Sequence, residues 1–135
     1  MPVDDHDLAR LTDAARLART RAYAPYSNFP VGCALLLADG TVVTGANVEN
    51  GSYPLGLCAE TAAMASLYAD HPEGERSIVA VVVAGPDGVA DCSPCGACRQ
   101  WIHELAPEAV VAFPWHGQQV AVTVDELLPF GFSLD

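Results

Sequence analysis

The segments Cys58-Ala59-Glu60 and Pro94-Cys95-Gly96-Ala97-Cys98 decide how this chain has to fold. They supply three cysteine thiolates, which are preferred zinc ligands, and three protein ligands leave one tetrahedral position open for a water. An open position is typical of a catalytic zinc rather than a structural one, because the metal lowers the pKa of that water from about 15.7 toward about 7. We therefore expect the fold to bring residues 58–60 and 94–98 together around one metal ion.

Glu60 lies two residues after the first thiolate, where a carboxylate can move the protons of a water at the metal. The order C-x-E followed by P-C-x-x-C is typical of the zinc deaminases that act on nucleobases, in the variant with three cysteines. The alternatives are a solvated glutamate at a helix start, a redox C-x-x-C, or a closed zinc site. A closed site needs a fourth ligand, and His103, close to the second ligand pair, stays open as a candidate.

Four blocks of the chain resemble the short, homotetrameric, zinc-dependent cytidine deaminases, and they cover nearly its whole length. The blocks are YSNFPVG (26–32), NVENGSYPLGLCAE (47–60), SPCGACRQ (93–100) and TVDELLP (123–129). The resemblance implies one Zn²⁺ per subunit and hydrolytic deamination of cytidine and deoxycytidine to uridine and deoxyuridine, with release of ammonia, in pyrimidine salvage. It also implies a homotetramer whose sites are completed by neighbouring subunits.

The resemblance assigns roles to the residues around the metal. Glu60 would take a proton from the water that attacks C4 of cytosine and would pass protons to N3 and then to the departing amine. The backbone N–H of Ala59 would hold the pyrimidine O2 atom, and the carbonyl of Ser93 would accept a hydrogen bond from the amine.

Further substrate contacts are implied by the same resemblance. Asn47 and Glu49 match the ribose ligands, and alternate positions of an extended segment do point to the same side. Without the flanking motif, a polar strand end would be the simpler interpretation of this pair. Phe29 is similar to the aromatic that packs beside the base. Tyr53 and Phe132 resemble residues that one subunit contributes to the site of its neighbour in the tetramer.

Each of these aromatics, taken alone, is also explained by plain core packing. Phe130 is an extra aromatic near the C-terminus. The sequence leaves open whether Phe130 or Phe132 reaches the neighbouring site.

One position departs from the family pattern, because Thr61 follows Glu60 where most relatives have an arginine. A cation that would support the thiolates is therefore missing, and Arg99, directly after Cys98, is the candidate to replace it. We hypothesise that the metal site is more electron-rich than in arginine-bearing relatives and that its water is less acidic.

Length and composition predict a single catalytic domain over residues 1–135, since 51% hydrophobic residues can form a core without disulfides. The acidic N-terminus is opposite to a signal peptide, and no apolar run reaches membrane-span length, so we expect a cytoplasmic protein without a membrane partner. The net charge of −11, with six arginines and no lysine, disfavours a nucleic-acid partner. Of the two other cysteines, Cys33 is expected in the core, and Cys92 is a weak alternative ligand.

Hydrophobic periodicity predicts an α/β protein, a three-layer α-β-α sandwich with a mixed sheet of about five strands. Helices are expected over residues 4–22, 58–69 and 95–105. Strands are expected over 31–38, 41–45, 77–84, 109–113 and 119–122, with a hairpin turn at Asp39-Gly40 and a capping box at Thr123-x-x-Glu126.

Three other functions compete with nucleoside deamination. Deamination of a cytosine-containing antibiotic such as blasticidin S would use the same chemistry, but the Asn47 and Glu49 pair favours a ribose. A non-catalytic zinc-binding interaction module would need a second metal knuckle and leaves Glu60 unexplained. Polynucleotide editing is disfavoured by the acidic charge and by the lack of interleaved basic and aromatic segments.

Overall fold

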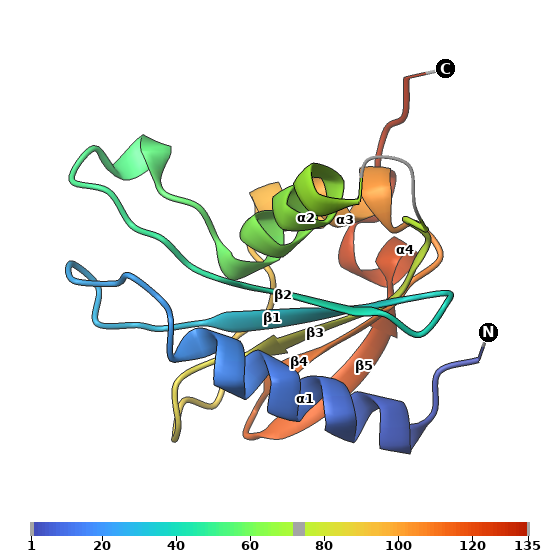
Figure 1. The fold of residues 1–135 in the computed structure, drawn as a ribbon, viewed down its shortest axis with the longest axis horizontal. Coiled ribbons are helices and arrows are strands. Elements are labelled where there is room, and N and C mark those ends of the chain that lie inside the picture. The colour runs from blue at the N-terminus through green and yellow to red at the C-terminus, as the bar shows by residue number, and fades with distance from the viewer. Residues whose placement is uncertain (1, 72–74, 135) are drawn as a thin grey trace.

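A five-stranded sheet crosses the centre of the computed structural model, which describes residues 2–71 and 75–134 (Figure 1). The strand order is β2-β1-β3-β4-β5, and β3 and β4 pair in parallel while the other neighbours pair antiparallel. This confirms the expected mixed sheet. The strands are β1 (Gly32–Leu37), β2 (Val42–Ala46), β3 (Ile78–Ala84), β4 (Val110–Trp115) and β5 (Gln118–Thr123).

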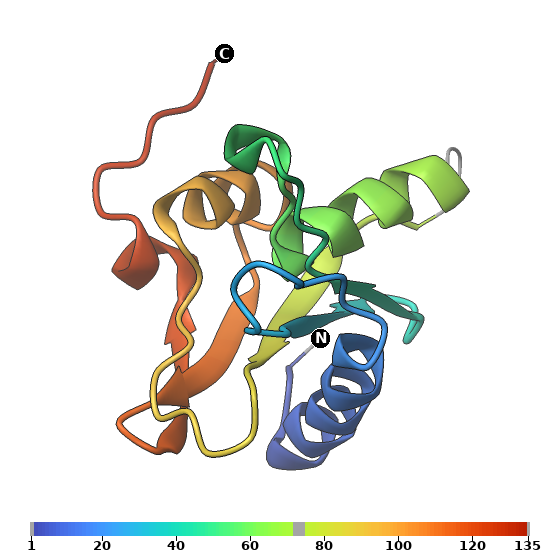
Figure 2. The same cartoon turned by 90° about the vertical axis from the view of Figure 1, so that its left-hand side faces the viewer.

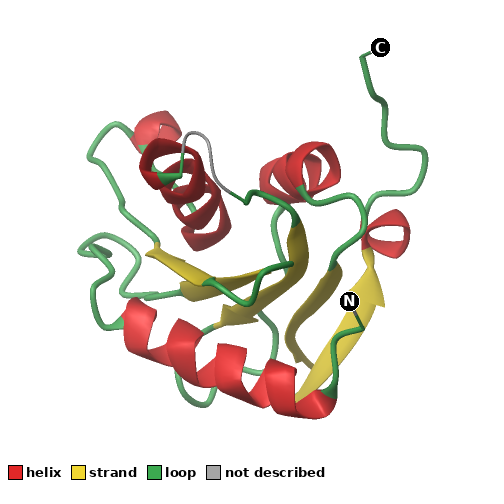
Figure 3. Ribbon diagram, turned by 45° about the vertical axis from the view of Figure 1, so that its right-hand side comes forward, coloured by secondary structure: helices red, strands yellow, loops and turns green. Residues whose placement is uncertain are grey.

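Helices cover both faces of the sheet, as the expected three-layer sandwich requires (Figure 3). The first helix, α1 (Asp5–Arg19), lies on one face, while α2 (Ala59–Asp70) and α3 (Gly96–Leu105) lie on the other (Figure 1). A short helix, α4 (Val124–Leu127), follows β5, and a 3₁₀ turn, η1 (Tyr53–Leu55), precedes α2.

Strand β1 explains how one sheet carries two cores. All six of its residues are buried, which is the pattern of a strand covered on both faces. Successive side chains alternate between the faces, so Leu35 packs in the core cluster that contains Met64 of α2. Leu36 packs instead in the cluster that contains Leu11 of α1.

A glycine sets the distance between α2 and the sheet. A Cβ atom at Gly45 would lie 2.4 Å from the backbone nitrogen of Ala63 and 2.8 Å from the carbonyl oxygen of Ala59. The backbones of β2 and α2 are therefore in direct contact at this point. Because Ala59 begins α2, this contact also positions the start of the helix that carries Glu60.

The helix boundaries differ slightly from the predicted ones. The first helix ends at Arg19 rather than near residue 22, since residues 20 and 21 form a turn. The second and third helices begin one residue later than expected, which makes Cys58 and Cys95 their N-cap residues. The predicted capping box is confirmed, with Thr123 Oγ1 accepting from the Glu126 N–H at 3.2 Å and Glu126 Oε1 accepting from the Thr123 N–H at 3.0 Å.

Two loop segments project together from the end of the sheet near α2 (Figures 1 and 2). Residues 47–57 lead from β2 to α2, and residues 20–31 lead from α1 to β1. They are joined by backbone hydrogen bonds from Tyr23 N–H to Asn47 O at 2.9 Å and from Glu49 N–H to Tyr23 O at 2.8 Å. Within the described residues, no helix is long and apolar enough to cross a membrane.

Candidate active site

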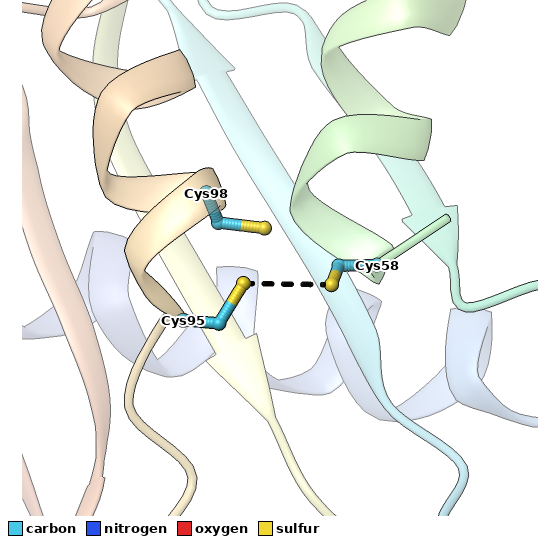
Figure 4. Close-up of side chains that lie close together, drawn as sticks. All are labelled: Cys58, Cys95 and Cys98. Carbon is cyan, nitrogen blue, oxygen red and sulfur yellow. Dashed lines mark hydrogen bonds between the residues drawn. The ribbon is translucent and has the colours of Figure 1, made fainter. Parts of the chain in front are cut away.

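The starts of two helices converge at the three cysteines. Cys58 is the N-cap of α2, Cys95 is the N-cap of α3, and Cys98 lies in the first turn of α3. Figure 4 shows their sulfur atoms directed toward one another from the two helices. Both N-cap residues have extended backbones and make no side-chain cap hydrogen bond, so their sulfurs remain available to a metal.

The spacing of the sulfurs fits a tetrahedral zinc. The three Sγ atoms lie within 4.8 Å of one another, and those of Cys58 and Cys95 are 3.7 Å apart. Zn–S bonds of about 2.3 Å at tetrahedral angles place two sulfurs about 3.8 Å apart. Three cysteine ligands also suit zinc chemically. The fold therefore brings together the three cysteines that the sequence predicted as zinc ligands.

The surroundings of the sulfurs favour a thiolate at the helix start. The pKa of Cys58 is lowered to about 6, chiefly by hydrogen bonding with Cys98 and also with Cys95. The same interaction raises the pKa of Cys98, which donates, well above its usual value, and burial adds to this rise. The unpaired N–H groups of both helix N-termini add positive potential that stabilises negative sulfur.

Glu60 lies in the first turn of α2 and is almost completely buried. The residue is 4% exposed, and it is the one charged residue that is buried in the part of the chain that the structure describes. Burial raises the pKa of its carboxyl group to about 6, and the nearby Cys58 adds to the rise. A carboxyl group with this pKa can both accept and donate a proton near neutral pH.

A cavity of about 180 Å³ opens beside these groups. Its lining combines residues from the loop before β1, the end of β2, the start of α2, the end of β3 and the loop before α3. The residues are Phe29, Val31, Asn47, Cys58, Ala59, Glu60, Val83, Cys92, Ser93 and Cys95. The fold therefore gathers at one cavity most of the side chains that the sequence singled out.

Asn47 braces the loop that carries Phe29. Its Oδ1 atom accepts from the Val31 N–H at 2.8 Å, and its Nδ2 atom donates to the Phe29 carbonyl at 2.9 Å. An amide has two donor hydrogens and two acceptor lone pairs, so one of each stays free for a ligand in the cavity.

Glu49 lies at a different pocket, of about 330 Å³, that also includes Tyr53. Its carboxylate accepts from the N–H groups of Tyr26 and Ser27 at 3.0 and 3.1 Å, and from the Ser27 hydroxyl. These bonds lower the pKa of Glu49. From the sequence, no role was assigned to Tyr26 or Ser27. Their position in the YSNFPVG block, which resembles the family, was the one sign that they contribute to the site.

Two predicted substrate residues lie away from the cavity of their own chain. Tyr53 is 74% exposed and makes an edge-on contact with Tyr26, with ring centroids 5.9 Å apart. Phe132 is 65% exposed in the C-terminal tail, and Phe130 in the same tail is fully exposed. Neither Tyr53 nor Phe132 lines the cavity beside Glu60.

Arg99, which we predicted to support the thiolates, makes hydrogen bonds to other partners. Arg99 Nε donates to the Pro94 carbonyl at 2.9 Å and Nη1 donates to the Leu127 carbonyl at 3.0 Å, so both hydrogen bonds go to backbone oxygens rather than to sulfurs. The reason is geometric, because the side chain extends from α3 toward α4. Thr61 contacts the three-cysteine cluster, with its Oγ1 atom 3.5 Å from Cys98 Sγ.

The alternative metal ligands do not join the cluster. Cys92 lines the cavity but is not part of the group of close sulfurs, and burial raises the pKa of its thiol to about 11. The Nε2 atom of His103 lies 3.3 Å from the Ser133 hydroxyl in the C-terminal tail. Cys33 is completely buried in the core, as expected.

Comparison with known proteins agrees with this geometry. Residues 5–113 match the family model described as the cytidine and deoxycytidylate deaminase zinc-binding region. A cytidine deaminase of Halalkalibacterium halodurans is 44% identical over 131 residues, which is 96% of each chain. One of Mycobacterium tuberculosis is 41% identical over 132 residues, covering 97% of this chain and 93% of the relative.

Structural similarity extends over nearly the whole chain. The crystal structure of a cytidine deaminase from Burkholderia pseudomallei has a TM-score of 0.83 at 43% identity, covering 92% of this chain and 98% of the other. A more distant relative, a blasticidin-S deaminase of Bacillus cereus, is 29% identical over 107 residues, 76% of each chain. The matched region contains all three cysteines and Glu60, and the chain therefore belongs to the cytidine and deoxycytidylate deaminase zinc-binding family.

Proposed function

We propose that this protein, as one catalytic domain, hydrolyses cytidine and deoxycytidine to uridine and deoxyuridine with release of ammonia. The observation that carries the proposal is a cavity lined by the buried Glu60 and by Cys58 and Cys95, two members of the three-cysteine cluster. The similarity to cytidine deaminases at 41–44% identity supports the same reaction.

Cys58, Cys95 and Cys98 would hold one Zn²⁺, which supplies the Lewis acid that makes a water nucleophilic near neutral pH. Glu60 would accept one proton from the attacking water and deliver it to N3 of the pyrimidine. It would then accept the second proton, from the hydroxyl now on C4, and deliver it to the amine that leaves C4. A buried carboxyl group with a pKa of about 6 suits these alternating roles. The water oxygen adds to C4 first, and the C4–N bond breaks afterwards as the C4=O bond forms, so the products are the uracil nucleoside and ammonia.

The remaining cavity residues would bind and orient the nucleoside. The Ala59 N–H would donate to the pyrimidine O2 atom, the Ser93 carbonyl would accept from the amine, and Phe29 would pack beside the base. Asn47 would use its free amide hydrogen and lone pair on the sugar hydroxyls, next to Glu49. All of these except Glu49 line the cavity that contains Glu60.

We further propose a homotetramer in which Tyr53 and Phe132 complete the site of a neighbouring subunit. Their exposure in a single chain supports this assignment, as does the projection of the loop and the tail away from the sheet (Figure 1). Sedimentation at assay concentration should give four chains per particle. Phe132→Ala should raise the KM for cytidine while Phe130→Ala should not, and the reverse result would assign the role to Phe130.

A cytoplasmic location is proposed as well, since a reducing compartment keeps the site's thiols free of disulfides. Fractionation of cells that express the protein tests this: it should accumulate in the cytosolic fraction, and accumulation outside the cell would contradict the proposal.

The deciding experiment follows the ultraviolet change as cytosine becomes uracil. Zinc-loaded protein would be given cytidine, deoxycytidine, cytosine, cytidine monophosphate and blasticidin S in parallel. The two nucleosides should turn over, and Glu60→Gln should lose at least about 10²-fold in kcat, while Glu104→Gln, an exposed glutamate of α3, should match the natural protein. Activity on blasticidin S alone, or unchanged turnover in Glu60→Gln, would overturn the proposal.

A further inference from the structure

Arg99 bridges two distant parts of the chain through backbone oxygens. Its Nε atom donates to the Pro94 carbonyl at 2.9 Å, and its Nη1 atom donates to the Leu127 carbonyl at 3.0 Å. Both bonds are partly shielded from solvent, and both come from one planar guanidinium group. Such a group holds its two acceptors in a fixed relative geometry, because its donors form a rigid fork.

One end of this bridge sets the geometry of a zinc ligand. The Pro94 carbonyl belongs to the peptide unit that joins Pro94 to Cys95, and Pro94 is completely buried. Holding this carbonyl fixes the plane of that peptide and therefore the backbone from which the Cys95 side chain extends toward Cys58. Arg99 itself lies one residue after the ligand Cys98, so the bridging side chain also starts from the metal loop.

The other end of the bridge holds the C-terminal segment. Leu127 ends α4, a helix of four residues that is too short to be stable alone. As the last residue of the helix, Leu127 has a carbonyl with no partner inside the helix. Its position depends on the burial of Val124 and Leu127, on its capping box, and on the bond from Arg99. Four residues further along α3, His103 contacts Ser133, so α3 holds the segment at two places.

We propose that Arg99 is a positioning residue that couples the zinc loop to α4, so that the zinc affinity of the cysteine cluster depends on the packing of the C-terminal segment. Coupling between two sites is reciprocal, so bound zinc should in turn stabilise α4. The proposal rests on the zinc site of the proposed function, but it concerns metal binding rather than turnover.

Zinc affinity measured by competition with a chromophoric chelator, in reducing buffer and without substrate, tests the coupling. Arg99→Gln should weaken zinc binding by about tenfold, the lower range for loss of a group that orients a metal ligand. Arg99→Lys should weaken it nearly as much, because an ammonium keeps the charge but cannot bridge both carbonyls. If Arg99→Lys bound zinc as tightly as the natural protein, the charge alone would matter, and the proposal would be overturned.

A change remote from the metal makes the test sharper. Glu126→Ala removes the exposed carboxylate of the α4 capping box and should weaken zinc binding about threefold, the effect of a lost cap. Asp7→Ala removes the equivalent carboxylate from the capping box of α1, on the other face of the sheet, and should leave zinc binding unchanged. The double variant Arg99→Gln/Glu126→Ala should bind zinc no more weakly than Arg99→Gln alone, whereas additive losses would overturn the coupling.

Two further readouts separate coupling from general destabilisation. Zinc should slow hydrogen exchange at the Leu128 N–H, which bonds to the Val124 carbonyl at 2.9 Å, in the natural protein but not in Arg99→Gln. The visible spectrum of the Co²⁺-loaded protein should change in Arg99→Gln, because the position of Cys95 shifts. Equal exchange with and without zinc would overturn the proposal, even if Arg99→Gln failed to fold. A protein with this coupling but no nucleoside turnover would overturn the proposed function alone.

Discussion

The hydroxyl of Thr61 lies 3.5 Å from the Sγ atom of Cys98, which is the buried member of the three-cysteine cluster. A hydroxyl can donate to a thiolate, and such a bond partly offsets the negative charge that three sulfurs bring to one zinc. Thr61, at the position where the resemblance implies an arginine, therefore still contacts the cluster, but through a neutral hydroxyl.

Thr61→Val keeps the shape of the side chain and removes its hydroxyl. We expect zinc affinity to fall about tenfold, while Thr61→Ser, which keeps the hydroxyl, stays close to the natural protein. Chelator competition measures both variants. Equal affinities of the valine and serine variants would show that the contact with Cys98 has no effect on the metal.

Thr61→Arg tests whether the metal site is electron-rich. A cation beside the thiolates should withdraw negative charge from the metal and make the nucleophilic water more acidic, so the acid limb of the pH profile of kcat/KM should move to lower pH. The same profile measured for the natural protein and for Thr61→Ser provides the reference. An acid limb that stays in place would contradict this interpretation.

Burial of Glu60 should cost the metal-free protein stability at neutral pH. The folded state raises the pKa of this carboxyl from 4.5 to about 6, so the folded protein binds more protons than the unfolded chain between these values. The free energy of unfolding therefore falls as the pH rises through this window. Glu60→Gln removes the effect and should stabilise the metal-free protein by about 2 kcal/mol at pH values above about 6.

Urea unfolding in the presence of a chelator and a reductant measures this gain. The gain should disappear below about pH 4.5, where Glu60 is protonated in both states. Glu104→Gln, at an exposed position of α3, is the matched control. A gain of equal size at both pH values would mean that charge burial is not its cause.

Glu49 should act on substrate binding through the loop that it holds. Its carboxylate accepts three hydrogen bonds from Tyr26 and Ser27, so Glu49→Ala releases that loop as well as removing the carboxylate. We expect the KM for cytidine to rise by about tenfold or more, with a smaller change in kcat. Asp39→Ala, which removes a similar carboxylate from the β1–β2 turn, should leave the KM unchanged. A loss confined to kcat would contradict the assignment to binding.

Gly45 should tolerate no side chain. Alanine would place its Cβ atom 2.4 Å from the Ala63 nitrogen, so α2 has to move away from β2 at a cost of about 1–3 kcal/mol. Because α2 begins with Cys58 and Glu60, zinc affinity should fall as well. Gly96→Ala provides the stability control, since no atom lies within 4 Å of its added Cβ. Thermal unfolding with an unchanged midpoint in Gly45→Ala would contradict the close contact seen here.

The secondary structure could be predicted from the sequence because it depends on local patterns. Alternation and apolar runs located all five strands, and a capping box located α4. The predicted helix starts at Cys58 and Cys95 were one residue too early. Each of these cysteines is an N-cap residue, which is distinguished from the first helical residue here by its backbone angles and not by its residue type. The three candidate ligands and Glu60 could also be singled out, because metal ligation and proton transfer require particular residue types at particular spacings.

The partners of side chains could not be predicted in the same way. Sequence adjacency suggested that Arg99 supports the thiolates, yet α3 directs its guanidinium group toward Leu127, 28 residues along the chain. It also gave no sign that Glu49 holds the loop at Tyr26 and Ser27.

The sequence by itself therefore determined the strands and helices, the candidate zinc ligands and the class of reaction, since these follow from local propensity and from the chemistry of individual side chains. The tertiary structure alone decided that Thr61 contacts Cys98, that Arg99 joins the zinc loop to α4, and that Tyr53 and Phe132 lie outside their own cavity. These relationships depend on how helices cross a sheet, and crossing geometry is set by long-range packing, as at Gly45, rather than by neighbours in the chain.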